Sequence, residues 1–350
     1  MKTRKTPSVQ TSLLPDPPAP AAAADRPDRG LDPDDALVHD TLCALQAPSH
    51  VSRVVEMMAA AGLRTQRRTA FNPMEVRRSV DALVAAGHAQ RDTQGRVHAV
   101  QPAAGERFRE MMREPRAAKA WFEAWRDVNR FDHAYTLGYQ DEEQLAAAMR
   151  LVIFGGATLQ HLQRLGELAY SFTHLWSGAL RKALLHPFDA RLFGRLAPVL
   201  QQSLSDHLMM ALSGFAESAG KPLEDWLIAR GAADPQALSP DLRCRLAESL
   251  LFRGNFAGAL ALCDAEQGSY PDLIRAARVI AQGEWNEGAA QFEAALKRAA
   301  AELGRRKNLT SPSLLWLYLM ALLASPRSGR RRASSPLPKW ARAAPIPMAC

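Results

Sequence analysis

The alternation of apolar and polar residues is clearest between residues 71 and 101, which read FNPMEVRRSVDALVAAGHAQRDTQGRVHAVQ. Asn72 is a favourable helix N-cap, and Pro73 suits the first helical position. Gly87 suits the position after a helix end, where positive φ is common. Between them, apolar residues recur at the spacing of a single helix face, at Val76, Val80, Leu83 and Val84. The pattern therefore predicts a helix that begins at Pro73 and ends before Gly87.

Two short strand candidates follow this helix, at residues 88–91 and 96–100. The four residues between them, Asp92-Thr93-Gln94-Gly95, are typical of a turn, with glycine where a hairpin requires it. A helix followed by a β-hairpin is the second half of a winged helix. Upstream, apolar periodicity and helix-breaking residues predict two more helices, at 36–45 and 50–61. Residues 34–104 are therefore expected to form a winged-helix module.

The chain after this module is predicted to be all-helical. Residues 105–235 contain long stretches with helical spacing, including segments at about 106–131 and 157–185. Their aromatic residues are interpreted as core rather than as a ligand site. The predicted fold class is mainly α, with a winged-helix module followed by a helical array.

An internal repeat marks the last part of that array. Residues 246–264 align with residues 276–294 at an offset close to 29, which pairs Gly254 with Gly283 and Phe256 with Trp285. Each half is a helix, a glycine turn, an aromatic residue and a second helix. This pattern resembles a tetratricopeptide hairpin, although the period is shorter and only two copies are clear. Residues 236–325 are expected to form such hairpins, with generic antiparallel helices as the alternative.

The two ends of the chain differ in composition from the residues between them. Residues 1–33 are rich in Pro and Ala and are expected to be disordered. Residues 326–350 contain no Asp or Glu and five prolines, and they also predict a disordered tail. We expect that the chain is a truncated form of a longer protein, cut near Ser325 by a shift of reading frame. The alternative is a native basic tail that binds nucleic acid.

The net charge of +8 is concentrated in these tails. Residues 1–30 hold five basic and three acidic residues, and residues 326–350 hold six basic residues. Removing them from the totals of 44 basic and 36 acidic residues leaves 33 of each in residues 31–325. The body is neutral, so an argument for nucleic-acid binding has to be local.

A local excess exists within residues 50–100, which hold eight arginines and four acidic residues. Such a cluster can position a module on double-stranded DNA through phosphate contacts. We expect phosphate contacts from six arginines and a base contact from one serine: Arg67, Arg68, Arg77, Arg78, Arg91, Arg96 and Ser79. Winged helices also act as protein-binding or structural spacers, and that alternative stays open. A protein partner on the helical repeats is the second expected class of ligand.

No catalytic, cofactor or metal site is predicted. The sequence lacks a phosphate-binding loop, GxGxxG, GxSxG, HExxH and a DEAD- or DEAH-like tetrapeptide. Its four cysteines are far apart, and the histidines at 133, 161, 174, 186 and 207 lack the spacing of a ligand set. Residues 314–324 are apolar but about half the roughly 20 residues that a bilayer requires. We expect a cytoplasmic protein without a membrane segment.

The order of these parts suggests a family. A Pro/Ala-rich start, a winged-helix-like module, a helical middle and tetratricopeptide-like hairpins together resemble the N-terminal, non-motor region of large bacterial DEAD/DEAH-box helicases of the SWI/SNF-like type. The resemblance covers about residues 34–325. In that family the ATPase motifs lie downstream, so no catalytic residue carries over. The resemblance implies a non-catalytic, accessory role in a DNA-acting protein.

Overall fold

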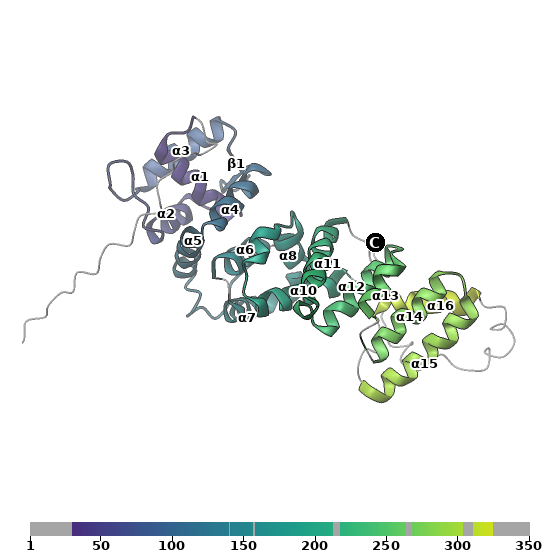
Figure 1. Cartoon of the computed structure of the whole chain (residues 1–350). Coiled ribbons are helices and arrows are strands. Elements are labelled where there is room, and N and C mark those ends of the chain that lie inside the picture. The colour runs from purple at the N-terminus through teal and green to yellow at the C-terminus, as the bar shows by residue number, and fades with distance from the viewer. Residues whose placement is uncertain are drawn as a thin grey trace, which may run out of the picture. The chain divides into compact units, whose positions relative to one another are not determined.

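The computed structural model describes residues 30–324 apart from 140, 157, 213–217, 264–265, 267 and 304–310. The predicted disordered tails, 1–33 and 326–350, lie outside the described residues except for residues 30–33, where the first helix begins. The described residues form sixteen α-helices and one two-stranded antiparallel sheet (Figure 1). The prediction of a mainly α fold is confirmed.

The described residues divide into two compact units, with the division between Ser171 and Phe172. The predicted domain limits at 104/105 and 235/236 each fall inside one of these units and stay predictions. In the first unit, helices that precede residue 104 pack on helices that follow it.

The first unit begins with three helices and a hairpin. The hairpin strands pair antiparallel with Ala89 opposite Ala99, and a further bridge joins Ser49 to Val97. The linker between the first two helices therefore pairs with the second strand. The elements, in chain order, are α1 (Pro33–Leu45), α2 (Val51–Ala60), α3 (Pro73–Ala85), β1 (Ala89–Arg91) and β2 (Val97–Ala99).

The third helix, α3, forms where the sequence predicts it. The Asn72 side chain accepts hydrogen bonds from the backbone N–H groups of Met74 and Glu75, both at 2.9 Å. The Glu75 carboxylate in turn accepts from the backbone N–H of Asn72 at 2.9 Å, which completes a capping box. Gly87, with φ of 77°, follows the helix. Local signals thus fix both ends of α3.

Helices α1 and α2 pack on the helices that follow the hairpin, which are α4 (Ala103–Arg113), α5 (Pro115–Val128) and α6 (Glu142–Leu151). Arg107 of α4 binds the buried carboxylate of Asp40 through two nitrogens, at 2.7 and 3.1 Å. Arg53 of α2 donates to the Val128 carbonyl at 2.9 Å and to Asn129 Oδ1 at 2.6 Å. The first unit continues with a π-helical turn at Val152–Gly156 and α7 (Leu159–Leu168).

The second unit is entirely helical in its described residues. Its first part contains α8 (Thr173–Leu185), α9 (Ala190–Gly194), α10 (Pro198–Leu212) and α11 (Lys221–Ala233). Its second part contains α12 (Pro240–Phe252), α13 (Phe256–Cys263), α14 (Ser269–Ala281), α15 (Trp285–Leu303) and α16 (Pro312–Ala324), which share one hydrophobic core.

Two tight turns in the second part have the same geometry. Gly254 between α12 and α13 has φ of 77°, and Gly283 between α14 and α15 has φ of 91°. Each glycine donates its N–H to a carbonyl three residues earlier at 3.0 Å, Leu251 in one turn and Ile280 in the other. Both positions need a residue that tolerates positive φ. The 29-residue offset in the sequence therefore corresponds to two hairpins with equivalent turns.

Candidate nucleic-acid interface

The eight arginines between residues 50 and 100 fall into two groups. Three are ion-paired with acidic residues of the same segment: Arg53 with Glu56 at 3.3 Å, Arg91 with Asp81 at 2.5 Å and Arg96 with Asp92 at 2.6 Å. The fourth acidic residue, Glu75, is committed to the capping box of α3. The positive charge that remains therefore belongs to the other five arginines.

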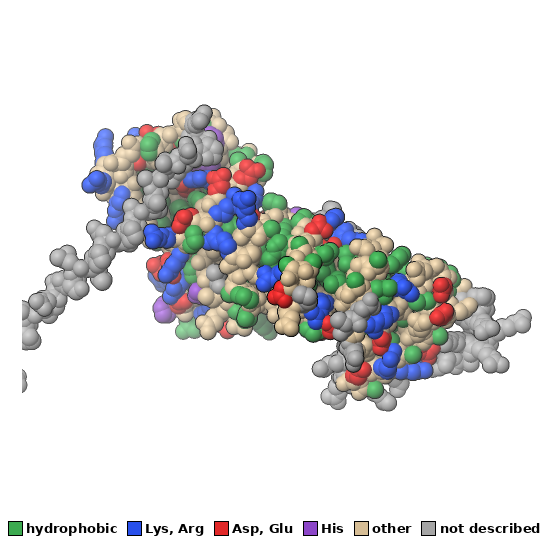
Figure 2. Space-filling view, viewed as in Figure 1, with side chains coloured by type: hydrophobic (Ala, Val, Ile, Leu, Met, Phe, Trp, Pro, Cys, Tyr) green, Lys and Arg blue, Asp and Glu red, His purple; other side chains and the backbone are tan. Residues whose placement is uncertain are grey.

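These five side chains are exposed and have no hydrogen-bond or ion-pair partner among the described residues: Arg64, Arg67, Arg68, Arg77 and Arg78. They lie on the connection between α2 and α3 and on α3 itself. Figure 2 shows Lys and Arg side chains at the outer edge of the part of the chain that carries α1, α2 and α3.

The connection between α2 and α3 is a structured loop. Arg64 forms an antiparallel bridge with Ala70, and the Thr65 N–H donates to the Thr69 carbonyl at 2.9 Å. The hydroxyls of Thr65 and Thr69 are also hydrogen-bonded at 2.8 Å. These bonds hold Arg67 and Arg68 at the tip of the loop.

Two carboxylates from the start of the first unit lie against the same loop. Asp34 accepts from the Gln66 N–H at 2.9 Å, and Asp32 accepts from the Gln66 side chain at 3.1 Å. Their negative charge offsets part of the positive potential at the loop tip. The arginines of α3 are therefore the stronger candidates for phosphate contact.

On α3, the apolar and basic residues lie on opposite sides. Val76, Val80 and Leu83 are fully buried against the module core, whereas Arg77 and Arg78 are exposed. The two arginines belong to the N-terminal half of the helix. They can reach a ligand without any rearrangement of the core.

The predicted site residues differ in their exposure. Ser79 is 2% exposed, because its position on α3 faces the core, so its contact with a base stays a prediction that this conformation does not favour. Arg91 and Arg96 are engaged in ion pairs that a phosphate would have to replace. Arg64 was missed, although it lies two residues after Gly62 in the same basic loop as Arg67 and Arg68.

The ion pair between Arg96 and Asp92 is accompanied by a change in the pKa of Asp92. Desolvation acts to raise the pKa of Asp92, but hydrogen bonds from the Arg96 side chain and from the backbone N–H groups of Arg96 and Gln94 outweigh it. The net result is a pKa of Asp92 below its usual value. The Asp92 carboxylate is thus held in the hairpin turn, where it accepts a hydrogen bond from the Gln94 N–H at 2.9 Å.

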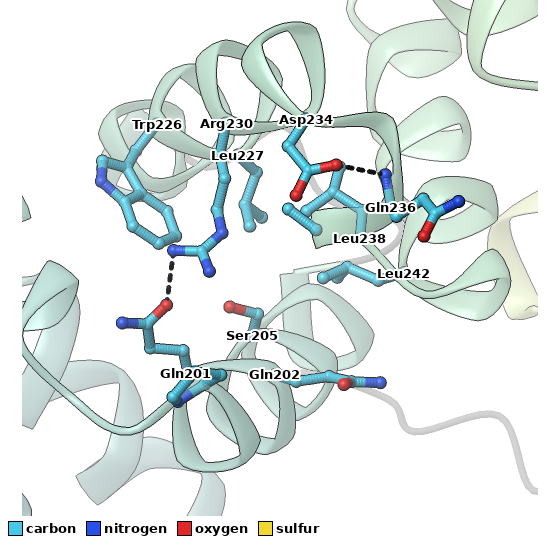
Figure 3. Close-up of a pocket in the computed structure, with 12 residues that line it drawn as sticks. Gln201, Gln202, Ser205, Trp226, Leu227, Arg230, Asp234, Gln236, Leu238 and Leu242 are labelled. Carbon is cyan, nitrogen blue, oxygen red and sulfur yellow. Dashed lines mark hydrogen bonds between the residues drawn. The ribbon is translucent and has the colours of Figure 1, made fainter.

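A second candidate site is a cavity of about 300 Å³ between α10, α11 and the start of α12 (Figure 3). Arg230 donates to Gln201 Oε1 at 2.6 Å and lies 5.2 Å from the centre of the Trp226 ring. Gln201 is buried and donates to the carbonyls of Gly194 and Leu196 at 3.0 and 2.6 Å. These contacts fix the Arg230 guanidinium between two helices. The arrangement fits a structural contact in which hydrogen bonds connect α10 to α11.

Neither a metal-binding group nor a membrane-spanning helix is found among the described residues. No group of three or more His, Cys, Asp or Glu side chains there is arranged to hold a metal ion. His161 is half-buried, and its ring centre lies 4.8 Å from that of Phe122. None of the helices in the described ranges has both the length and the apolar character needed to cross a bilayer.

Comparisons with protein-family models, with curated proteins and with solved structures find no match. The resemblance to the non-motor region of SWI/SNF-like helicases therefore stays a prediction.

Proposed function

We propose that residues 34–104 form a winged-helix-like module that binds double-stranded DNA without catalysing a reaction. The order of elements supports this assignment. Three helices precede a β-hairpin, and the linker after α1 pairs with β2 through Ser49 and Val97. In helix-turn-helix proteins the third element of this series is the helix that enters the major groove. In this chain that element is α3.

The observation that carries the proposal is the pair of exposed, unpaired arginines on α3. Arg77 and Arg78 lie in the N-terminal half of the helix, which is the half that approaches DNA in this class of module. The opposite sides of the module are occupied, because α1 and α2 pack on α4, α5 and α6. Arg77 and Arg78 stay exposed beside this packing.

The loop between α2 and α3 supplies additional phosphate contacts in this proposal. Arg64, Arg67 and Arg68 would contact the DNA backbone beside the groove and contribute affinity rather than sequence discrimination. Arg91 and Arg96 instead maintain the hairpin through their ion pairs. An accessory role beside a helicase motor is consistent with such a module and forms part of the same proposal.

A second candidate function is a tetratricopeptide-like scaffold for a protein partner. The equivalent glycine turns at Gly254 and Gly283 favour it, because they produce successive helical hairpins with a shared core. In that case the winged-helix-like module is structural and the arginines of α3 are only solvated.

DNA titration of the full chain separates the two functions. We expect the wild type to bind a fluorescent duplex at low salt and Arg77→Ala/Arg78→Ala to bind at least about tenfold more weakly, because two phosphate contacts are lost. The matched control is Arg116→Ala/Lys119→Ala, which removes the same charge from an exposed part of α5 and should change affinity by less than about threefold. Absence of binding by the wild type, or equal losses in both variants, would favour the scaffold.

A further inference from the structure

The cavity between α10, α11 and the start of α12 contains an arginine that is not ion-paired with any described residue (Figure 3). Arg230 is half-buried, and its side chain contacts the Gln201 oxygen and the Trp226 ring. A guanidinium has five N–H groups, and the bond to Gln201 uses one of them. The Arg230 charge is therefore available to an anionic group that enters the cavity.

Buried groups hold this guanidinium in one place. The Gln201 side chain is buried, and its Nε2 donates to two backbone carbonyls at 3.0 and 2.6 Å. Its Oε1 is thereby oriented to accept from Arg230. The Trp226 ring lies against the guanidinium and packs edge-on against Phe193, with ring centres 5.2 Å apart. A cation fixed before the ligand arrives loses little freedom on binding.

A buried hydroxyl faces the same space. Ser205 is 1% exposed, and Figure 3 shows its Oγ pointing into the cavity beside Gln201 and Arg230. It forms no hydrogen bond with another residue in the described ranges of the chain. Buried polar groups rarely lack a partner, and a serine hydroxyl can donate to a carboxylate oxygen. Ser205 and Arg230 thus provide two donors for one carboxylate.

A negative charge lines the same cavity. Asp234 lies four residues after Arg230, a spacing at which opposite charges on a helix commonly pair. These two side chains do not pair, because the guanidinium is turned toward Gln201 and one Asp234 oxygen accepts from the Gln236 N–H at 2.9 Å. The cavity therefore presents one positive and one negative group that do not neutralise each other.

The rest of the wall is apolar and the space is small. Three buried leucines contribute to the lining: Leu227, Leu238 and Leu242. The volume of about 300 Å³ lies at the lower end of the roughly 300–1,000 Å³ found for small-molecule sites. It equals about ten times the roughly 30 Å³ that a water molecule occupies in the liquid. The space suits one small molecule with an apolar part.

We propose that this cavity binds a small zwitterion with an apolar side chain, namely a free apolar α-amino acid. Its carboxylate accepts hydrogen bonds from Arg230 and Ser205, its ammonium group faces Asp234, and its side chain lies on the leucines. A plain monocarboxylate leaves Asp234 without a counter-charge, and a dianion such as phosphate brings more negative charge toward it. This inference goes beyond the proposed DNA binding and does not depend on it.

Isothermal titration of the full chain tests this proposal with five probes, used one at a time: L-alanine, L-valine, L-leucine, L-methionine and L-phenylalanine. We expect saturable binding of at least one. The amino acid that binds most tightly is then compared with its analogues that lack the ammonium group or the carboxylate, which for L-leucine are isocaproate and isoamylamine. Each analogue should bind at least about tenfold more weakly, because one of the two charged contacts is lost.

Two charge-removing variants locate the site. Arg230→Gln and Asp234→Asn should each weaken binding at least about tenfold, and the asparagine keeps an oxygen that can accept from the Gln236 N–H. The matched controls are Lys221→Gln and Asp225→Asn, which remove the same charges from an exposed ion pair at 2.6 Å on the same helix. These controls should stay within about threefold of the wild-type affinity.

Three results would overturn the proposal. The first is no binding of any of the five amino acids. The second is full affinity for the analogue that lacks the ammonium group, which would show that Asp234 takes no part in recognition. The third is wild-type affinity in Asp234→Asn, or an equal loss in the controls, which would place the ligand elsewhere. Asp234→Asn and the analogues decide the question even if Arg230→Gln does not fold.

Discussion

Ser79 and Arg78 are adjacent in the sequence, yet only the arginine is available to a ligand. A helix turns by about 100° per residue, so neighbouring side chains can point to the core and to solvent. In the sequence the two residues therefore look like one basic and polar site. Once the helix packs on its core, they face different surroundings.

The buried position of Ser79 leads to a prediction. Ser79→Ala should leave the affinity of the full chain for duplex DNA within about twofold of the wild type, because the side chain is 2% exposed. The same anisotropy titration used for the arginine variants measures it. A large loss of affinity without a loss of thermal stability would mean that Ser79 contacts the DNA in a different conformation.

A buried carboxyl in the second unit gives a pH-dependent prediction. Burial raises the pKa of Glu248, and the hydrogen bonds from Ser311 and Tyr270 and the charge of Arg245 only partly oppose it. A raised pKa in the folded state stabilises the fold fully below the ordinary glutamate pKa, and this contribution is lost as the pH rises through the folded value. Lowering the pH from 8 toward 5 should therefore stabilise the wild type relative to Glu248→Gln.

Urea unfolding of both proteins at several pH values measures this difference. Glu284→Gln, which removes an exposed carboxylate, serves as the control for the loss of one charge. A difference between wild type and Glu248→Gln that stays constant with pH, or that grows in the opposite direction, would show that the Glu248 carboxylate is not destabilised by burial.

At the scale of elements, the sequence predicts most where the signals are local. The limits of α3 follow from Asn72, Pro73 and Gly87, and the structure has them within about two residues of the prediction, which is the usual uncertainty of helix ends. The hairpin after it is also found, as strands at Ala89–Arg91 and Val97–Ala99. Caps and turns depend on a few neighbouring residues, so they can be recognised without the rest of the fold.

Breaks between helices were harder to predict. The segment expected at 106–131 is two helices, because Glu114 caps a new helix that begins at Pro115. The segment expected at 157–185 is likewise divided by a 3-10 turn at Tyr170–Phe172. Apolar periodicity continues across both breaks, so the pattern alone does not show that the chain changes direction.

Long-range pairs were not predictable from the sequence. Arg107 donates a hydrogen bond to Asp40, and Arg230 donates one to Gln201. The members of each pair are far apart in the sequence, so only the fold shows that they are neighbours. The same limit applies to the candidate site. The excess of arginine in residues 50–100 was visible, but which of them are neutralised by Asp81 and Asp92 depends on the packing of the hairpin.

The equivalent hairpins provide a test of helix packing. Gly288→Ala should lower the free energy of unfolding by about 1–3 kcal/mol, because the new Cβ would lie 2.6 Å from Ile280 Cγ1 and 2.7 Å from the Ile280 backbone nitrogen. Gly194→Ala is the matched control, since nothing lies within 4 Å of its Cβ position. That variant should be neutral or more stable by up to about 1 kcal/mol.

Thermal or urea unfolding distinguishes the two glycine variants. Equal stability of Gly288→Ala and the wild type would contradict the close approach of α14 and α15.

At the scale of the whole molecule, the distribution of charge matters more than its total. Residues 31–325 are neutral, so nonspecific attraction of the folded body to DNA should be weak. Binding through the unpaired arginines of the first unit should instead show the salt dependence of a small number of phosphate contacts. This expectation distinguishes a defined site from the general effect of basic residues near the ends of the chain.

The measurement that tests this account most directly is the salt dependence of duplex binding by the full chain and by Arg77→Ala/Arg78→Ala. We predict that the slope of log affinity against log salt concentration becomes smaller by about two in the double variant, one for each lost phosphate contact. The control Arg116→Ala/Lys119→Ala should keep the wild-type slope. An unchanged slope in Arg77→Ala/Arg78→Ala, or wild-type binding that disappears when residues 326–350 are deleted, would contradict DNA binding through α3.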